Sequence, residues 1–147
     1  MNWSKKYIVK ERKMRIIIWG SRKINRIKAK EIIENKIEEL KPELIITSAE
    51  TEGVCSLARE IAKNKLISLL VGFADTEKYH NGAYKKRAEE LLKYGDYAIL
   101  IHNGSSTGTI MEKNLLEKNN IKYEYILLEE IDKINMFDIE NIKIFDK

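Results

Sequence analysis

The sequence has few of the residues that cross-link a chain or interrupt its helices. Its 147 residues include one cysteine, Cys55, and one proline, Pro42. A single cysteine excludes an internal disulfide and a cysteine-based zinc site, and its place on an apolar helical face indicates a core residue rather than a nucleophile. The two histidines, His80 and His102, stand apart from carboxylate clusters. We therefore predict neither a bound metal nor a cofactor.

Long apolar runs are also missing. No run approaches the length of a membrane span, and the N-terminus, Met-Asn-Trp-Ser-Lys-Lys, has no apolar signal region. We expect a cytoplasmic protein that does not interact with a membrane. The 44% hydrophobic and 34% charged residues are typical of a folded domain, and the net charge of +4 favours anionic ligands without requiring nucleic acid.

The signatures of the common nucleotide-binding enzymes are absent as well. The turn that starts at Gly20 reads Gly-Ser-Arg-Lys-Ile-Asn and lacks the second and third glycines of a dinucleotide fingerprint. The chain contains no Gly-Lys-Ser/Thr sequence, so it has no P-loop. Ordinary dehydrogenases and P-loop NTPases are therefore excluded.

Apolar runs alternate with segments of helical periodicity along most of the chain. Strands are predicted at 15–19, 44–47, 66–71, 97–101 and 123–128, with helices between them and a long irregular segment at 72–82. This alternation predicts an α/β fold, a Rossmann-like three-layer sandwich with a mainly parallel sheet of five or slightly more strands. We predict an N-terminal basic arm (1–13), one Rossmann-like domain (14–128) and a C-terminal extension packed on it (129–147).

In the stretch 96–112 a predicted buried strand is followed by residues with almost no side-chain bulk. Residues 104–109 read Gly-Ser-Ser-Thr-Gly-Thr and precede a helical pattern. Backbone amides in such a turn, backed by a helix N-terminus, suit a phosphate. The alternative interpretation is structural, because Thr109-x-x-Glu112 also fits a capping box at the start of the helix.

Small or polar residues follow two other predicted strands. They are Gly20-Ser-Arg and the segment 48–53, Ser-Ala-Glu-Thr-Glu-Gly. The carboxyl ends of parallel strands meet at one edge of the sheet, where such folds bind ligands. The three loops together therefore predict one site.

In their order and spacing these motifs resemble the SLOG superfamily, the Rossmann-like group of the Lonely Guy phosphoribohydrolases and DprA, and most closely its stand-alone YspA-like branch. The resemblance covers about residues 14–128. It rests on Gly20-Ser-Arg, the turn at 48–53, Phe73-Ala-Asp-x-x-x-Tyr79 with Arg87, and Gly104-x-Ser-x-Gly-Thr109. It implies a nucleotide-derived ligand, and in Lonely Guy enzymes the Glu that matches Glu112 and the Arg that matches Arg87 cleave an N-glycosidic bond.

The resemblance and the loops together give a set of expected site residues. Glu112 and Arg87 are the candidate catalytic residues, with Arg22 as a second phosphate contact, and Glu50 is expected to accept hydrogen bonds from a ribose or a base. The expected ligand-binding residues are Gly20, Ser21, Arg22, Ser48, Glu50, Gly53, Tyr79, Gly104, Ser105, Ser106, Thr107, Gly108 and Thr109.

Departures from the family pattern shift the balance between functions. Gly104-Ser-Ser replaces the Pro-Gly-Gly of Lonely Guy enzymes, and two glutamates, Glu50 and Glu52, stand where the branch has Gly-Gly-x-Arg-Gly. We therefore expect a nucleotide sensor or binding module, with phosphoribohydrolase activity as the alternative. Single-stranded nucleic acid binding, through the basic and aromatic residues at 78–87, is a second alternative, and homo-oligomers are left open.

Overall fold

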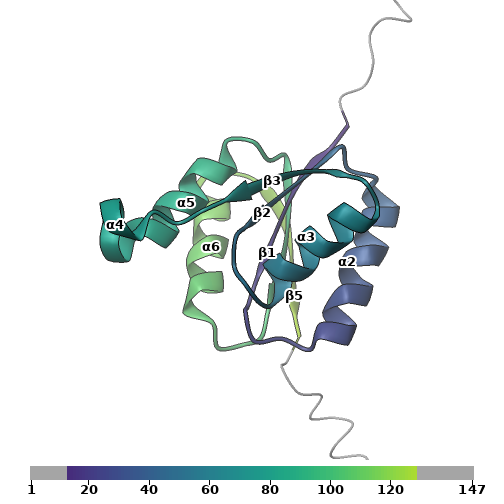
Figure 1. The fold of residues 1–147 in the computed structure, drawn as a ribbon, viewed down its shortest axis with the longest axis horizontal. Helices are drawn as coiled ribbons and strands as arrows, with labels where there is room; N and C mark the ends of the chain where they lie inside the picture. The colour runs from purple at the N-terminus through teal and green to yellow at the C-terminus, as the bar shows by residue number, and fades with distance from the viewer. Residues whose placement is uncertain (1–12, 129–147) are drawn as a thin grey trace, which may run out of the picture.

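The computed structural model describes residues 13–128. Its five strands are β1 (Arg15–Gly20), β2 (Leu44–Ser48), β3 (Ser68–Gly72), β4 (Tyr97–His102) and β5 (Lys122–Leu127). They form one parallel sheet in the order β3-β2-β1-β4-β5 (Figure 1). The predicted Rossmann-like α/β fold with a five-stranded parallel sheet is confirmed. The expected N-terminal arm and C-terminal extension lie mainly or wholly outside the described residues.

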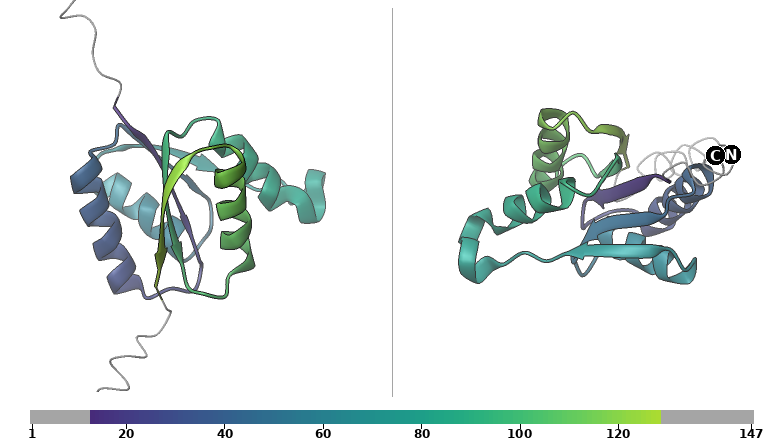
Figure 2. Two further views of the ribbon diagram at one scale, coloured as in Figure 1. Left: turned by 180° about the vertical axis from the view of Figure 1, so that it is seen from behind. Right: turned by 90° about the horizontal axis from the view of Figure 1, so that it is seen from above.

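Helices cover both faces of this sheet, which gives three layers (Figure 2). The helices are α2 (Arg26–Leu40), α3 (Val54–Asn64), α4 (Thr76–Tyr79), α5 (Ala83–Leu92) and α6 (Thr107–Lys118). α2 and α3 pack on one face, and α5 and α6 pack on the other. No helix within residues 13–128 combines the length and the apolar character needed to cross a membrane.

The central strand β1 shows why the chain adopts this architecture. Successive side chains of a strand point to opposite faces. Ile16 and Ile18 accordingly join the core under α2 and α3, while Ile17 and Trp19 join the core under α5 and α6. All four are fully buried. A strand that is apolar on both faces therefore needs a helical layer on each side.

Two predicted elements differ from the structure by more than one residue at an end. β3 begins at Ser68 rather than at residue 66, because Leu66, two residues after the end of α3, has a left-handed conformation, with φ of 57°, and is exposed. The segment 72–82, predicted as irregular, contains α4 and a 3-10 turn, His80–Gly82. Figure 1 shows α4 projecting from the body of the molecule beyond α5.

Candidate functional site

A pocket of about 420 Å³ opens where β1 and β4 end. The sheet order reverses between these two strands, and ligands of open α/β sheets bind at such a point. Residues from the three predicted loops, from α5 and from α6 line it. They are Gly20, Arg22, Lys23, Glu50, Cys55, Tyr84, Arg87, Asn103, Ser106, Thr107, Gly108, Thr109, Met111 and Glu112.

The N-terminus of α6 forms one wall of this pocket. Ser106 is the N-cap, and its hydroxyl accepts a hydrogen bond from the Thr109 amide at 3.4 Å. Thr107 and Gly108 are the first two helical residues, and their amides have no partner within the helix. Both line the pocket, so these amides and the positive end of the helix dipole are available to an anion there. The capping-box interpretation of Thr109 and Glu112 is wrong, because the helix begins two residues before Thr109.

In the first half of the predicted phosphate-binding turn, residues 104–106, the protein itself already uses two backbone amides. The side-chain oxygen of Asn103 accepts hydrogen bonds from the amides of Ser105 and Ser106, at 2.9 and 3.0 Å. Gly104, at φ of 97°, and Ser105 lie outside the pocket lining. The backbone amides of this turn that stay open are therefore those of Thr107 and Gly108, because Ser106 and Thr109 already use theirs. Asn-Gly-Ser is a sequence signal for this kind of side-chain turn, and it could have identified the role of Asn103.

Ser21 supports the site from behind rather than lining it. Its hydroxyl accepts a hydrogen bond from the Asn103 amide at 3.0 Å and lies 3.3 Å from the Thr109 hydroxyl. Ser21 is buried and directly follows β1, whereas Asn103 follows β4. This one hydroxyl therefore ties the ends of the two central strands to the start of α6.

The opposite wall is an ion-pair cluster on Glu50. One Glu50 oxygen is 2.7 Å from the Arg87 guanidinium, and the other is 2.8 Å from that of Arg22. The Arg87 side chain is 9% exposed and that of Arg22 is 52% exposed. Tyr84 presents its ring to both guanidinium groups, at 5.1 Å from Arg87 and 5.8 Å from Arg22. The sequence predicts that Glu50 binds a ligand, but its two oxygens already accept hydrogen bonds from the two arginines.

The charge state of Glu50 follows from these contacts. Burial alone would raise the pKa of this carboxyl, but the hydrogen bonds and charges of Arg87 and Arg22 outweigh burial. The pKa of Glu50 therefore lies below its ordinary value, and Glu50 is ionised at neutral pH. The cluster of two arginines and one carboxylate keeps one net positive charge.

Two residues hold the Glu50 loop in place. Arg59 on α3 donates hydrogen bonds to the backbone carbonyls of Ser48 and Glu50. Gly53 has φ of 81°, and a Cβ at this position would lie 2.3 Å from the Ser21 carbonyl oxygen. Only glycine fits such a conformation so close to another backbone. Ser48 and Gly53 therefore shape the loop without lining the pocket. Arg59 supports the site although no motif in the sequence indicated it.

Glu112, from the second turn of α6, lines the pocket and is buried. Burial raises the pKa of this carboxyl to about 8, although the charge of Arg87 acts to lower it. Glu112 therefore holds a proton at neutral pH, whereas Glu50 does not.

The thiol of Cys55 belongs to the core under α5 and α6. Burial, followed by the charge of Glu112, raises the pKa of this thiol, so the thiolate needed of a nucleophile is disfavoured.

His102, which the sequence predicts as a polar strand-end or loop residue, is buried at the end of β4. Its Nε2 lies 3.1 Å from the Ser106 carbonyl oxygen, and its Nδ1 contacts the Tyr125 hydroxyl. A carbonyl can only accept, so Nε2 carries the proton in this arrangement. The imidazole therefore links β5 to the N-cap of α6.

Tyr79 does not reach the pocket. It lies on α4, where it lines a separate hollow with Phe73. Among the basic and aromatic residues considered for nucleic acid binding, Arg87 is mostly buried against Glu50, and Lys86 lies 3.5 Å from Glu90. Binding of single-stranded nucleic acid stays a prediction.

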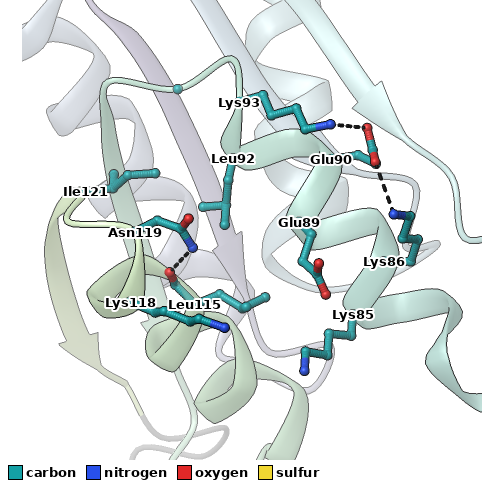
Figure 3. Close-up of a pocket in the computed structure, with 11 residues that line it drawn as sticks. Lys85, Lys86, Glu89, Glu90, Leu92, Lys93, Leu115, Lys118, Asn119 and Ile121 are labelled. Carbon is teal, nitrogen blue, oxygen red and sulfur yellow. Dashed lines mark hydrogen bonds and ion pairs between the residues drawn. The ribbon is translucent and has the colours of Figure 1, made fainter.

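A larger hollow of about 570 Å³ lies between α5 and α6 at the opposite edge of the sheet (Figure 3). Leu92, Leu115 and Ile121 contribute apolar surface, and lysines surround them. Glu90 pairs with two of these lysines in Figure 3. The hollow lies beside the amino ends of β4 and β5, away from the edge where parallel sheets bind ligands. We therefore place the candidate site at the smaller pocket.

Comparison with known proteins adds no family to this description. The chain matches no protein-family model, no curated protein and no solved structure. What is established is an α/β fold with five parallel strands and a charged pocket at their carboxyl edge.

Proposed function

We propose that this pocket binds a phosphorylated ligand of the nucleotide class, and that the protein acts as a sensor or binding module for it. The observation that carries the proposal is the meeting of two kinds of anion-binding group. The guanidinium of Arg22 and the amides that open α6 line the same pocket. The motifs that resemble the SLOG superfamily supply most of these residues, which supports the same class of ligand.

The ion pairs on Glu50 leave room for a phosphate. Arg22 uses one nitrogen to reach Glu50 and also interacts with the Tyr84 hydroxyl, but it is half exposed, so its other N–H groups can point to a ligand. Arg87 is more buried and fixes Glu50 from the other side. In this arrangement Glu50 positions Arg22, and the phosphate binds between Arg22 and the start of α6. A ribose hydroxyl would add a further hydrogen bond to a Glu50 oxygen that already accepts one.

A matched pair of arginine variants tests the proposal. Arg22 and Arg26 are similarly exposed, at 52% and 54%, and each forms an ion pair, but only Arg22 lines the pocket. We expect Arg22→Met to weaken binding of AMP and of ribose 5-phosphate at least tenfold, because a charge-assisted hydrogen bond contributes roughly 1.5–3 kcal/mol. Arg26→Met should leave both affinities within twofold. Isothermal titration calorimetry measures them, and a wild-type protein that binds no nucleotide, sugar phosphate or phosphate at millimolar concentration contradicts the proposal.

A second function, hydrolysis of the N-glycosidic bond of a nucleoside 5′-monophosphate, is favoured by the state of Glu112. A buried protonated carboxyl and an ionised one, Glu50, line the same pocket, and separated pKa values of this kind are typical of acid–base pairs. In this reaction Glu112 donates its proton to the departing base, water adds its oxygen to C1′ and returns a proton to Glu112, and free base and ribose 5-phosphate are released. The charge of Arg87 acts to lower the pKa of Glu112, so Arg87 lies near this carboxyl. In the hydrolase, Arg87 would hold the ribose phosphate.

Release of free base from nucleoside monophosphates, followed by chromatography, distinguishes the two functions. If the protein is a hydrolase, Glu112→Gln should lower turnover at least a hundredfold while AMP still binds, because general acid catalysis contributes roughly 10²–10⁴-fold. A variant that hydrolyses as fast as the wild type rules out this role for Glu112. Binding without turnover in the wild type supports the sensor.

A further inference from the structure

A second hollow adjoins the candidate site and has no role in the function proposed above. It encloses about 270 Å³ between the end of β3, α4 and α5. Its lining includes Phe73, Asp75, Tyr79 and Leu91. Arg87 lines this hollow as well as the pocket that holds Glu50 and Glu112. The two hollows are therefore neighbours that meet at the side chain of Arg87.

Two aromatic rings of this hollow are not used by the core. Phe73 is 77% exposed and directly follows β3, and Tyr79 is exposed on α4. Helix α4 has no buried residue, so packing of the core does not account for the position of Tyr79. The ammonium groups of Lys78 and Lys86 lie 5.1 and 6.0 Å from the Tyr79 ring centre. Exposed rings that line a hollow offer stacking surface to a flat molecule.

The hollow also has polar groups that can form hydrogen bonds, and these favour a heterocycle over a purely apolar ligand. Asp75 accepts a hydrogen bond from the Lys78 amide through one oxygen, at 3.1 Å, and the other oxygen makes none with residues 13–128. The Nε of Arg87 is buried and likewise has no hydrogen-bond partner in the described chain. A carboxylate oxygen accepts the N–H groups that a nucleobase carries at its edge.

We propose that this hollow is the subsite for the base of the ligand, with Phe73 and Tyr79 stacking on a planar aromatic heterocycle. The inference rests on the proposed nucleotide site, whose phosphate lies at Arg22 and α6. Arg87 lies between the two parts of the ligand and faces the sugar. The base then contributes affinity that a sugar phosphate alone lacks.

The experiment compares ribose 5-phosphate with AMP and GMP by isothermal titration calorimetry. In the wild type a nucleotide should bind at least tenfold more tightly than ribose 5-phosphate, as expected for one stacked base. Phe73→Ala and Tyr79→Ala should each remove most of this difference and leave the affinity for ribose 5-phosphate within twofold. Tyr79→Phe keeps the ring and should keep the difference. Tyr94→Ala is the control, since Tyr94 is 48% exposed and lines neither hollow.

The outcomes separate this inference from the function on which it rests. If ribose 5-phosphate binds and the base adds nothing, the subsite is wrong and the phosphate site stands. If neither compound binds, the proposed function fails as well. If Phe73→Ala changes the oligomeric state in sedimentation velocity but not the preference for a nucleotide, the exposed rings serve contacts between copies, and the subsite is overturned.

Discussion

Replacing Glu112 by Gln should make the protein more stable, and by an amount that grows with pH. The wild-type carboxyl is buried in α6, and its pKa is raised from 4.5 to about 8. In the unfolded chain it loses its proton near its ordinary value. Between these two pH values the folded state retains a proton that the unfolded state releases, so rising pH favours unfolding. Gln is neutral throughout and resembles the protonated acid in shape, so the variant lacks this penalty.

The size of the effect follows from the pKa difference. One pKa unit corresponds to about 1.4 kcal/mol, so the difference in unfolding free energy between Glu112→Gln and wild type should increase by about 3 kcal/mol from pH 5 to pH 8. Above the folded-state pKa both states are ionised, and the difference levels off. Below the ordinary pKa the carboxyl is protonated in both the folded and the unfolded state, and the difference in unfolding free energy is at its minimum. A domain with 5–15 kcal/mol of total stability would show this change clearly.

Urea unfolding at pH 5, 6, 7, 8 and 9, followed by circular dichroism, measures this difference. Glu89→Gln on α5 removes one carboxylate from an exposed position and controls for the change in net charge. The unfolding free energy of Glu89→Gln should depend on pH in the same way as that of the wild type. A difference between Glu112→Gln and wild type that stays constant across this range would show that Glu112 is ionised in the folded protein. The acid role proposed for it would then be wrong.

Two further predictions concern the loops around the pocket. Gly53→Ala should destabilise the fold by roughly 2 kcal/mol or more, because φ is 81° and the new methyl would meet the Ser21 carbonyl oxygen at 2.3 Å; Gly82→Ala, which meets no atom within 4 Å, is the control in the same thermal unfolding assay. A double-mutant cycle with Arg87→Met and Glu50→Gln should give a coupling energy of about 1.5 kcal/mol or more, since both side chains are mostly buried. A value below about 0.5 kcal/mol would mean that this pair behaves like an exposed one.

Periodicity was enough to predict the architecture, because the strands carry it without ambiguity. The run Ile16 to Trp19 is apolar on both faces, and only a sheet covered by helices on both sides buries it. Element ends were harder to predict. Leu66 is apolar and continues the pattern of the strand, but the local hydrogen bonds at the end of α3 place it in a left-handed, exposed conformation. Such an end depends on backbone geometry that apolar spacing does not report.

The candidate site was predictable as a place and less so as a set of contacts. Topology alone puts the ends of β1 and β4 together, so nine of the fifteen expected residues line one pocket. The sequence did not indicate which polar groups form hydrogen bonds with one another. Asn103 accepts hydrogen bonds from two amides of the predicted phosphate-binding turn, and Arg59 holds the loop that carries Glu50. These are single long side chains that reach backbone atoms, and no spacing rule marks them in the sequence.

Glu50 shows how a residue that argues against an anion site from the sequence can support one in the structure. Two guanidinium groups that face one pocket repel each other, and in a partly buried site this repulsion is weakly screened. Glu50 bonds to both, so Arg22 and Arg87 are held at fixed positions without a ligand. A phosphate that reaches the exposed nitrogens of Arg22 and the first amides of α6 then meets donors that are already oriented. The carboxylate weakens the attraction for any anion, and this favours ligands that contact both walls of the pocket over small anions that contact only one.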